Sequence, residues 1–576
     1  MNIRLKVFSW LVVLVFLAIW VRLGYWQIVR GAELAARAES QHFDSLDIAA
    51  RRGKIISGDG EVLGGTIDKY LLYIYKPHFS GKTEELVDKL LPFVWREGEI
   101  KTEEKEKKEE TRKMLMEKLS RESVWESLIK NLSAADRDEI IREIGEIGEI
   151  GGLGFEGQPQ RFYPEASMSA HVLGFVGSDA AGRPKGYFGI EGYYDRELRG
   201  VSGRLRQEKD AGGNPILVGS YQEVEPRPGR DVVLTIDRYV QALVEAELKK
   251  ALEKYGAAAG EVVIMDPTNG SIIASASFPN YDPNEFGKFD SKVYRNPAIS
   301  ETYEPGSTFK VLVMAAALNE GAVEPETKCD FCGGPVQIGK YLIRTWDEKY
   351  RDGVSMSDTI IHSDNTGMVF AGRKLGAEKM VEYLGKFGIG KATGIDLQEE
   401  AAPGLREKWG EIDVATASFG QGVAVTSMQM LRAVGAIANG GVVIVPHAAK
   451  SILDKGVERR IETKSGDRAV SKKTADAITE MMVGAVVEGE AKFAAPKGYR
   501  IAGKTGTAQI PVAGHYDSEK TIASFVGFAP ASNPKFVMIT KLREPTSSPW
   551  GSETAAPLWF SIAKKLLLYW GISPEE

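Results

Sequence analysis

A serine and a lysine three positions apart form the first motif whose residue types could support nucleophilic catalysis. Ser307 and Lys310 follow Pro305-Gly306 and begin the apolar run VLVMAAAL, which predicts a helix. Residues three apart share a helix face, so Lys310 can reach the Ser307 hydroxyl. Serine needs a neighbouring base, and a lysine kept neutral by burial or by nearby positive charge can provide it. The pattern alone is unspecific, because lysine also follows three other serines at this spacing, Ser127, Ser532 and Ser561.

The second motif is Ser363-Asp364-Asn365, which begins 56 residues after Ser307 in a polar interruption between two helical runs. In an extended loop, Ser363 and Asn365 would face a cleft while Asp364 turns back. Ser363 could then relay a proton, and Asn365 could hold a substrate amide. The same residue types also cap helices, so an ordinary helix start before TGMVFAG is the alternative.

The third motif, Lys504-Thr505-Gly506-Thr507, lies in RIAGKTGTAQI and is followed shortly by ASFVGFAP. These two runs predict an antiparallel hairpin, in which Gly506 lets a ligand approach the backbone. Lys504, with the hydroxyls of Thr505 and Thr507, offers a cation and two donors to a terminal carboxylate. The N–H groups of Thr507 and Ser307 could together hold an oxyanion.

The residues GYRIAGKT (498–505) also match the phosphate-binding loop pattern GxxxxGK[ST]. A phosphate-binding loop follows a buried strand and opens a helix at its lysine. Here EGEAKFAAP precedes the glycine and GTAQIPVAG follows the lysine, which is the reverse context. Nucleotide hydrolysis is therefore not expected.

The elements around the motifs predict a mixed α/β domain that begins near residue 226. The strand DVVLTID leads into a helix over 238–255, and EVVIMD, SIIASAS and KFVMITKL are strands that alternate with helical patterns. A last amphipathic helix covers 555–569, and an antiparallel sheet fits this order. Earlier in the chain, YLLYIY (70–75) predicts a strand, and KTEEKEKKEE (101–110) predicts a solvated helix.

Composition excludes several classes of function. With 43% hydrophobic and 26% charged residues, the bulk of the 576-residue chain is globular. A net charge of -6 provides no basic surface, so we expect no nucleic-acid partner. Two cysteines cannot complete a four-thiolate zinc site, and the six histidines form no HExxH pair. We therefore expect neither a metal nor another cofactor.

The N-terminal segment is apolar enough to span a membrane. Residues 7–21 carry no charge, and the apolar character continues to Val29, which suffices for a bilayer core if Arg22 reaches an interface. A cleaved signal peptide ending at Ala36-Arg37-Ala38 is the alternative, although aromatic and charged residues before that site suit cleavage poorly. Basic residues on both sides of the segment leave its orientation open.

The ordered set SxxK, SxN and KTG is the signature of penicillin-binding proteins and class A β-lactamases. The surrounding residues resemble more narrowly the class B penicillin-binding proteins, which are peptidoglycan D,D-transpeptidases, and particularly their cell-division type. The likeness rests on YEPGSTFK (303–310), SFGQG (418–422), IAGKTGTAQ (501–509), ASFVGFAP (523–530), RRGKIISGDGEVL (51–63), RFYPE through VLGFVG (161–177), GIEGYYDRELRG (189–200) and EVVIMDPTNGSIIASAS (261–277). It covers nearly the whole chain and loosens around residues 80–155.

The resemblance implies a role for each motif. Ser307 would be the acylated nucleophile and Lys310 its general base, with Ser363 and Asn365 as the second-motif pair. Residues 504–507 would form the strand for the substrate carboxylate and the oxyanion. The implied donor is a peptidoglycan stem peptide ending in D-Ala-D-Ala, whose last D-Ala is expelled before an amine of a neighbouring stem attacks the acyl-enzyme. β-Lactam antibiotics would acylate the same serine.

The resemblance also implies a domain order and a location. Residues 1–30 would be a cytoplasmic tip and a transmembrane anchor, 31–225 an elongated α+β pedestal similar to a dimerisation domain, and 226–576 the penicillin-binding transpeptidase domain. The protein would cross the bacterial inner membrane once, with its catalytic domain in the periplasm. The implied partners are a SEDS-family glycan polymerase and other division proteins.

Several alternatives stay open. An elongation or sporulation transpeptidase of the same class is the first, followed by a β-lactamase-like hydrolase and then a non-catalytic cell-wall scaffold. A hydrolase needs a second base to activate water, and a scaffold has no chemical need for Ser307, Lys310 and Lys504. Cys329 and Cys332, in CDFC, depart from the family pattern; we expect a structural role for them, with a redox site as the alternative.

Overall fold

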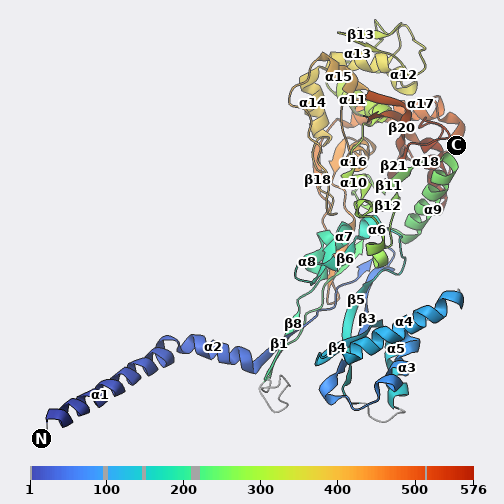
Figure 1. The fold of residues 1–576 in the computed structure, drawn as a ribbon. Coiled ribbons are helices and arrows are strands. Elements are labelled where there is room, and N and C mark those ends of the chain that lie inside the picture. Colours follow the sequence, from blue (N-terminus) through green and yellow to red (C-terminus); the bar gives the residue numbers. More distant parts are fainter. Residues whose placement is uncertain (1–2, 95–100, 146–150, 209–220, 513–514, 576) are drawn as a thin grey trace. The chain divides into compact units, whose positions relative to one another are not determined.

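The structure is a computed structural model that describes residues 3–94, 101–145, 151–208, 221–512 and 515–575. The chain divides into two units, coloured along the sequence in Figure 1. The smaller unit consists of Met1–Arg52 and Arg199–Gly229, and the larger unit consists of Gly53–Leu198 and Arg230–Glu576. All three motifs lie in the larger unit.

The smaller unit begins with the apolar helix that the sequence predicts. Helix α1 (Ile3–Gly24) continues through a π-helical turn (Tyr25–Val29), and together they are long and apolar enough to cross a membrane. None of the α1 side chains is buried against protein. The guanidinium carbons of Arg22 and Arg30 lie 5.3 and 5.1 Å from the centre of the Trp26 ring. Aromatic and basic side chains in contact suit a membrane interface.

A second helix and a small sheet complete the smaller unit. Helix α2 spans Gly31–His42 and leads directly into strand β1 (Phe43–Ile48). Strand β8 (Gly203–Glu208) pairs antiparallel with β1 on one side and with β9 (Tyr221–Val224) on the other. Two chain segments that lie far apart in sequence therefore form one sheet.

The first part of the larger unit packs helices on a sheet. Strand β3 (Val62–Tyr75) pairs antiparallel with β4 (Trp125–Leu132) and β5 (Leu153–Phe162). Helix α4 (Lys101–Ser120) confirms the predicted helix, and residues 108–110 on it are exposed. Its apolar residues near the end, such as Leu115, join a core with β3 and β4. Helix α3 (Thr83–Val94) packs against both α4 and α5 (Ala134–Gly145), as Figure 1 shows.

The sheet of this first part is extended by strands from the rest of the unit. Its order is β17-β16-β10-β2-β3-β4, where β10 (Asp231–Leu234) pairs parallel with β2 (Ile55–Ile56) and antiparallel with β16 (Ala449–Asp454). Strand β17 (Val457–Arg460) forms the outer edge. Five short elements follow β5 in the chain: α6 (Ala170–Leu173), β6 (Phe175–Ser178), β7 (Pro184–Tyr187), α7 (Gly189–Tyr193) and α8 (Asp195–Leu198). The short helix α10 (Pro297–Ser300) comes later in the chain.

A five-stranded antiparallel sheet forms the centre of the larger unit, which confirms the predicted mixed α/β fold. Its order is β12-β11-β21-β20-β19. The strands are β11 (Ala259–Met265), β12 (Ile272–Phe278), β19 (Ala502–Val512), β20 (His515–Ala529) and β21 (Phe536–Arg543). Side chains alternate between its faces: Val537 and Ile539 join one core, and Met538 and Leu542 join the other.

Helices cover both faces of this sheet. Helices α9 (Arg238–Tyr255) and α18 (Ala555–Tyr569), which span exactly the predicted residues, pack on one face. Helices α11 (Lys310–Asn319), α16 (Ser427–Ala438) and α17 (Lys472–Val487) pack on the other. All eight residues from 310 to 317 are buried, which explains why α11 is apolar on all sides beyond Lys310.

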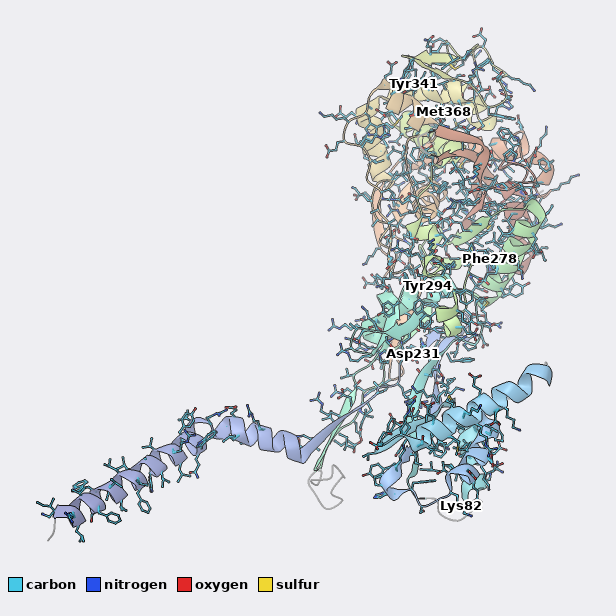
Figure 2. The ribbon with its side chains drawn as sticks, viewed as in Figure 1. Lys82, Asp231, Phe278, Tyr294, Tyr341 and Met368 are labelled. Atoms are coloured by element: carbon cyan, nitrogen blue, oxygen red, sulfur yellow. A yellow bond between two sulfur atoms is a disulfide. The ribbon has the colours of Figure 1, made fainter. Side chains whose placement is uncertain are left out.

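A helical layer with one β-hairpin lies around α11. Figure 2 labels Tyr341 at the end of the unit far from Asp231, and Met368 is in this layer. Its elements are β13 (Val336–Ile338), β14 (Tyr341–Ile343), α12 (Met356–Ile361), α13 (Asn365–Leu375), α14 (Ala377–Lys386) and α15 (Glu411–Ser418). Strands β15 (Val442–Ile444) and β18 (Ser465–Arg468) form a separate two-stranded sheet, and β15 contacts α16. The second motif lies between α12 and α13, which places it beside α11.

Candidate active site

The first motif lies in a short 3₁₀ turn, Gly306–Phe309, that leads directly into α11. Gly306 has a φ of 56°, in the left-handed region that favours glycine. A Cβ on Gly306 would also lie only 3.2 Å from the carbonyl oxygen of Thr507. Glycine therefore allows the turn to approach strand β19 closely, and Ser307 remains partly exposed at the end of the helix.

Lys310 is fully buried and connects the first motif to the second. Its Nζ donates hydrogen bonds to the Ser363 carbonyl oxygen at 2.6 Å, to Ser363 Oγ at 3.3 Å and to Asn365 Oδ1 at 2.8 Å. Burial, followed by the charge of Lys504, holds the pKa of Lys310 well below its usual value. A lysine in this state can be neutral and can accept a proton, as a base for Ser307 requires.

The second motif combines the two arrangements that the sequence predicts. Ser363 and Asn365 line the cleft, and Asp364 begins a helix. Asp364 caps α13, because its Oδ1 accepts the N–H groups of Thr366 at 2.8 Å and Gly367 at 3.0 Å. Ser363 has a φ of 59°, an unusual backbone conformation for a serine. Its conformation and the cap together direct Ser363 and Asn365 towards Lys310. Asn365 Nδ2 also donates to the Arg344 carbonyl at 2.8 Å.

The third motif lies on β19 at the end of the sheet, in the predicted hairpin with β20. Lys504 pairs with Val526 and Gly506 with Ser524. A Cβ on Gly506 would meet Ser524 Oγ at 2.5 Å and Thr308 Cγ2 at 2.8 Å, so only glycine lets this strand pass the first motif. The strand that follows Lys504 also excludes a phosphate-binding loop, which needs a helix there.

Lys504 is buried, and its neighbours on β19 have polar contacts. Its Nζ lies 3.2 Å from Thr505 Oγ1, and burial lowers its pKa. Thr507 Oγ1 accepts a hydrogen bond of 2.9 Å from the Gly551 N–H. These contacts fix the threonine side chains on the strand, where they can bind an anionic group.

The three motifs meet at one cleft of about 610 Å³. The predicted site residues on its surface are Ser307, Ser363, Asn365, Thr505 and Thr507. Lys310 and Lys504 are buried directly behind these residues. The cleft therefore presents hydroxyl and amide groups to a ligand, with two lysines beneath them. In the described part of the chain, no group of three or more His, Cys, Asp or Glu side chains is placed to hold a metal ion.

One acidic residue of the cleft was not identified from sequence. Glu490 lies after α17, and its Oε2 is 3.5 Å from Thr505 Oγ1. Its negative charge raises the pKa values of both Lys310 and Lys504, against the larger effect of burial. The stretch EGEAKFAAP around Glu490 has no periodic pattern, so no sequence signal places it opposite residue 505.

The hairpin β13–β14 also contributes to the cleft without a sequence signal. Tyr341 and Trp346 line the cleft, and the Trp346 ring lies 5.5 Å from that of Trp550 in an edge-on arrangement. The hairpin follows the disulfide between Cys329 and Cys332, which are both buried. The two tryptophans come from segments some 200 residues apart, so their contact could not be read from local patterns.

Two family descriptions match almost the whole chain. Residues 260–567 match the penicillin-binding protein transpeptidase domain, and residues 47–234 match the penicillin-binding protein dimerisation domain. The first match contains all three motifs. Both matches agree with the class B resemblance of the sequence.

Known proteins of this kind are similar over long stretches. Stage V sporulation protein D of Bacillus subtilis is 33% identical over 575 residues, which cover 98% of this chain and 85% of that protein. A probable peptidoglycan D,D-transpeptidase, PenA, of Neisseria meningitidis is 33% identical over 427 residues, 73% of this chain and 71% of the relative.

A solved structure shows the same fold. The crystal structure of penicillin-binding protein 2X from Streptococcus thermophilus aligns with a TM-score of 0.77 at 24% identity, covering 91% of this chain and 80% of the other. At that identity the likeness concerns the fold alone. From the matched domains and the relatives together, the chain belongs to the penicillin-binding proteins, with a dimerisation domain before a transpeptidase domain as in class B.

Proposed function

We propose that this protein is a serine-type peptidoglycan D,D-transpeptidase that crosslinks stem peptides in septal cell-wall synthesis. The observation that carries the proposal is the contact of Lys310 with Ser363 and Asn365 in the cleft that also contains Ser307 and β19. Acyl transfer needs four functional groups: a nucleophile, a base, a proton relay and a binding site for an anion. Candidates for all four lie together in this cleft. A scaffold has no need of this arrangement.

The first half-reaction forms an ester on Ser307. Neutral Lys310 takes the hydroxyl proton while Ser307 Oγ attacks the carbonyl carbon of the penultimate D-Ala. Lys504, Thr505 and Thr507 hold the terminal carboxylate, and the N–H groups of Ser307 and Thr507 stabilise the oxyanion. The C–N bond then breaks, and a proton passed through Ser363 goes to the departing D-Ala amine.

The second half-reaction transfers the acyl group. An amine of a neighbouring stem peptide attacks the ester carbonyl and loses its proton to the Lys310–Ser363 pair. The bond to Ser307 Oγ then breaks, and the same pair gives that oxygen its proton. The products are a crosslinked peptide and the free hydroxyl. β-Lactams would acylate the same serine, but the amine freed by ring opening stays attached to the acyl group. It would occupy the place that an acceptor amine needs, so the ester would persist and the enzyme would be inhibited.

Helix α1 and the family resemblance together support a placement in the cell. We propose a tip and anchor over residues 1–30, a pedestal over 31–225 and the transpeptidase domain over 226–576, with everything after the anchor outside the cytoplasm. The length and apolar surface of α1 support the anchor. The orientation and a SEDS-family glycan polymerase as partner are supported by the family resemblance alone.

A sporulation role is the second candidate. The similarity to a stage V sporulation protein extends over 98% of this chain, further than that to PenA. Depletion in the source bacterium separates the roles. Filaments without septa would support division, normal growth with defective spores would support sporulation, and rounded cells would support elongation.

Release of D-Ala tests the proposed reaction. The full-length protein in detergent is incubated with glycan strands carrying pentapeptide stems, and mass spectrometry follows D-Ala and crosslinked dimers. We expect equal amounts of both, none with Ser307→Ala, and unchanged amounts with Ser532→Ala, another serine three residues before a lysine. D-Ala without crosslinks would instead identify a carboxypeptidase.

A further inference from the structure

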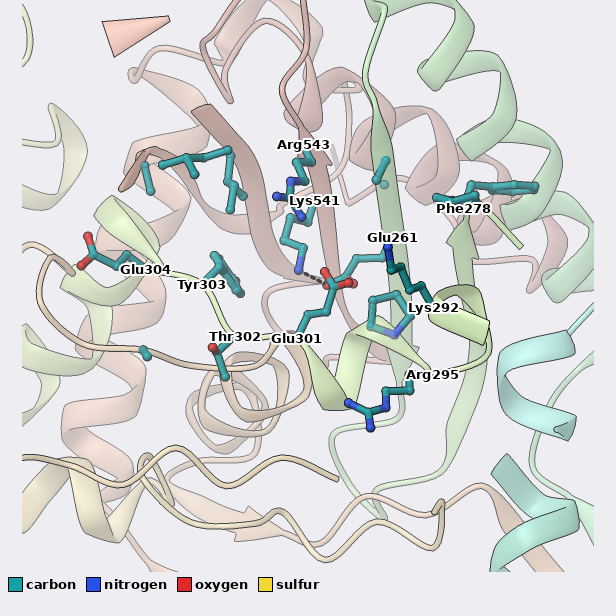
Figure 3. Close-up of a pocket in the computed structure, with 18 of the residues that line it drawn as sticks. Glu261, Phe278, Lys292, Arg295, Glu301, Thr302, Tyr303, Glu304, Lys541 and Arg543 are labelled. Atoms are coloured by element: carbon teal, nitrogen blue, oxygen red, sulfur yellow. Dashed lines mark ion pairs between the residues drawn. The ribbon is translucent and has the colours of Figure 1, made fainter. Parts of the chain in front are cut away.

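A second cavity of about 580 Å³ lies next to the catalytic cleft, at the end of the five-stranded sheet (Figure 3). Its walls come from the first residues of β11, the last residues of β21 and β19, and the segment that precedes Ser307. Charged side chains of both signs line it, namely Glu261, Lys292, Arg295, Glu301, Glu304 and Arg543, together with Lys541. None of these residues has a place in the reaction described above.

The two cavities are neighbours along three chain segments. Glu304 lines the second cavity and Gly306 lines the cleft. On β19, Ala508 lines the second cavity and Thr507 lines the cleft. On the loop beside them, Ala424 lines the second cavity and Gln421 lines the cleft. The boundary lies where Gly306 approaches β19, since a Cβ on Gly306 would be 3.4 Å from Ala508 Cβ.

A buried ion pair forms the floor of the second cavity. Glu261 on β11 and Lys541 on β21 are register partners, and their charged groups lie 2.8 Å apart, drawn as a dashed line in Figure 3. The Ser427 hydroxyl donates to Glu261, and Lys541 Nζ lies 4.5 Å from the centre of the Tyr303 ring. Buried pairs of this kind contribute little stability compared with apolar packing, so the floor is polar without an evident gain in stability.

Exposed charges of both signs surround this floor. Figure 3 shows Glu304 on one side and Lys292 and Arg295 on the other. Arg295 is paired with Glu399 at 3.0 Å, whereas Glu301 and Lys292 have no ion pair within the part of the chain that the structure describes. Arg543 Nε lies 3.3 Å from its neighbour Glu544, and this exposed contact leaves the terminal N–H groups of the guanidinium for a ligand. A ligand with one cationic and one anionic group would find a partner for each.

A substrate peptide bound along β19 would run from the catalytic cleft towards the second cavity. Strand β19 ends the sheet and pairs with β20, so an extended peptide can lie along its other edge. With the terminal carboxylate at Thr505 and the scissile carbonyl at Thr507, the rest of the stem continues past Gln509. At about 3.3 Å per residue, the one or two residues before D-Ala-D-Ala reach the second cavity.

We propose that the second cavity binds the residues of the donor peptide that precede D-Ala-D-Ala, holding a side-chain ammonium at Glu301 and a carboxylate at Arg543. This inference rests on the proposed transpeptidase function and adds a subsite to it. The subsite selects donors by charge at a distance from the reacting carbonyl, and binding there acts mainly on KM.

Two soluble donors that end in D-Ala-D-lactate test the subsite. The first carries a lysine and a γ-linked glutamate before D-Ala, and the second carries norleucine and glutamine in their places. Lactate release by the full-length protein in detergent gives kcat and KM for each. We expect kcat/KM about fivefold or more higher for the charged donor, through a lower KM.

Two variants and a control identify the groups responsible. Glu301→Gln is expected to remove the preference for lysine over norleucine, and Arg543→Gln the preference for glutamate over glutamine. Glu253→Gln, an exposed acid on α9, should change neither. Acylation by benzylpenicillin, which has no peptide stem, should stay constant in all of them.

Two results would overturn the subsite. One is an equal kcat/KM of the unmodified protein for the two donors. The other is a variant whose kcat/KM falls by the same factor for both donors. The proposed function fails separately, when benzylpenicillin does not acylate Ser307 in the unmodified protein.

Discussion

Lys310 Nζ and Asn365 Oδ1 lie 2.8 Å apart, although the two residues are 55 positions apart in the chain and belong to different motifs. The contact requires α11 and the start of α13 to pack side by side. It ties the base proposed for Ser307 to the residue proposed to hold the substrate amide. A change at either residue is therefore expected to affect the same step.

Replacing Lys310 with arginine should stop acylation while keeping a positive charge. Arginine is not deprotonated in proteins, so it cannot accept the Ser307 proton. We expect the acylation rate with benzylpenicillin to fall by about 10²–10⁴-fold, the usual contribution of a general base. Stopped-flow fluorescence measures this rate. Lys379→Arg, at an exposed ion pair on α14, should retain the full rate.

Replacing Glu490 with glutamine should move the whole pH profile of acylation to lower pH. In the proposed mechanism, the acid limb reports loss of the proton from Lys310, and the alkaline limb reports loss of the proton from Lys504. The Glu490 charge raises the pKa of both lysines, so its removal lowers both. We expect both limbs to move to lower pH.

The matched control for Glu490 is Glu488→Gln, at an exposed acid two positions earlier. Its profile should coincide with that of the unmodified protein. Other charges that face the cleft, Arg344, Arg406 and Asp413, are unchanged in both variants. Limbs that stay in place, or that move to higher pH, would show that Glu490 does not act through the two lysines.

The buried His171 should make the fold less stable as the pH falls. Its Nε2 donates to the Val293 carbonyl at 2.9 Å, and burial lowers its pKa to about 4 from the usual 6.5. Because protonation is easier in the unfolded chain, this stability is complete above pH 6.5 and is lost as the pH falls towards 4. The loss between pH 7.5 and pH 5 is about 2 kcal/mol in the free energy of unfolding.

Urea unfolding of the full-length protein at the two pH values measures this loss. His171→Gln lowers stability at both but should reduce the difference between them by about 2 kcal/mol. His78→Gln, at an exposed histidine, should keep the full difference. An unchanged difference in His171→Gln would contradict the assignment.

The buried ion pair of Arg161 and Glu191 should be essential for the first part of the larger unit. The two groups lie 2.6 Å apart, and Arg161 also donates to the Gly53 carbonyl at 2.6 Å. Removal of one partner leaves a buried charge unpaired, which costs about 3–5 kcal/mol. Glu191→Ala is expected to lower the free energy of unfolding by that amount, and Glu156→Ala, at an exposed acid on β5, by less than about 0.5 kcal/mol.

A loss below about 1 kcal/mol in Glu191→Ala would mean that the pair is exposed or replaced by water in solution. The double variant Arg161→Met, Glu191→Leu gives a second measure. It should be more stable than Glu191→Ala, because no charge is then left without a partner.

Local patterns predicted much of the fold. Helices α9 and α18 span the predicted residues because their periodicity and their bounding residues are both encoded locally. The hairpin of β19 and β20 was also predicted, since two apolar runs lie close together in sequence. The pairing of β10 with β2 was not, because it joins segments more than 170 residues apart.

The candidate site was predictable to the extent that its residues form short motifs. Ser307, Lys310 and Lys504 could be found because their spacing has a chemical meaning. Glu490 and Trp346 could not, because each reaches the cleft through a tertiary contact and has no motif of its own. Asp364 caps a helix and also belongs to the second motif. Local sequence patterns could not show that one residue does both.

Acylation of Ser307 by benzylpenicillin tests the central claim most directly. The full-length protein in detergent is incubated with the drug, and its intact mass is followed for hours beside Ser307→Ala and Ser532→Ala. The account predicts a mass increase of one penicillin that lasts for hours, is absent in Ser307→Ala and is present in Ser532→Ala. An adduct that persists in Ser307→Ala, or one that is lost within seconds while the drug is consumed, would contradict it.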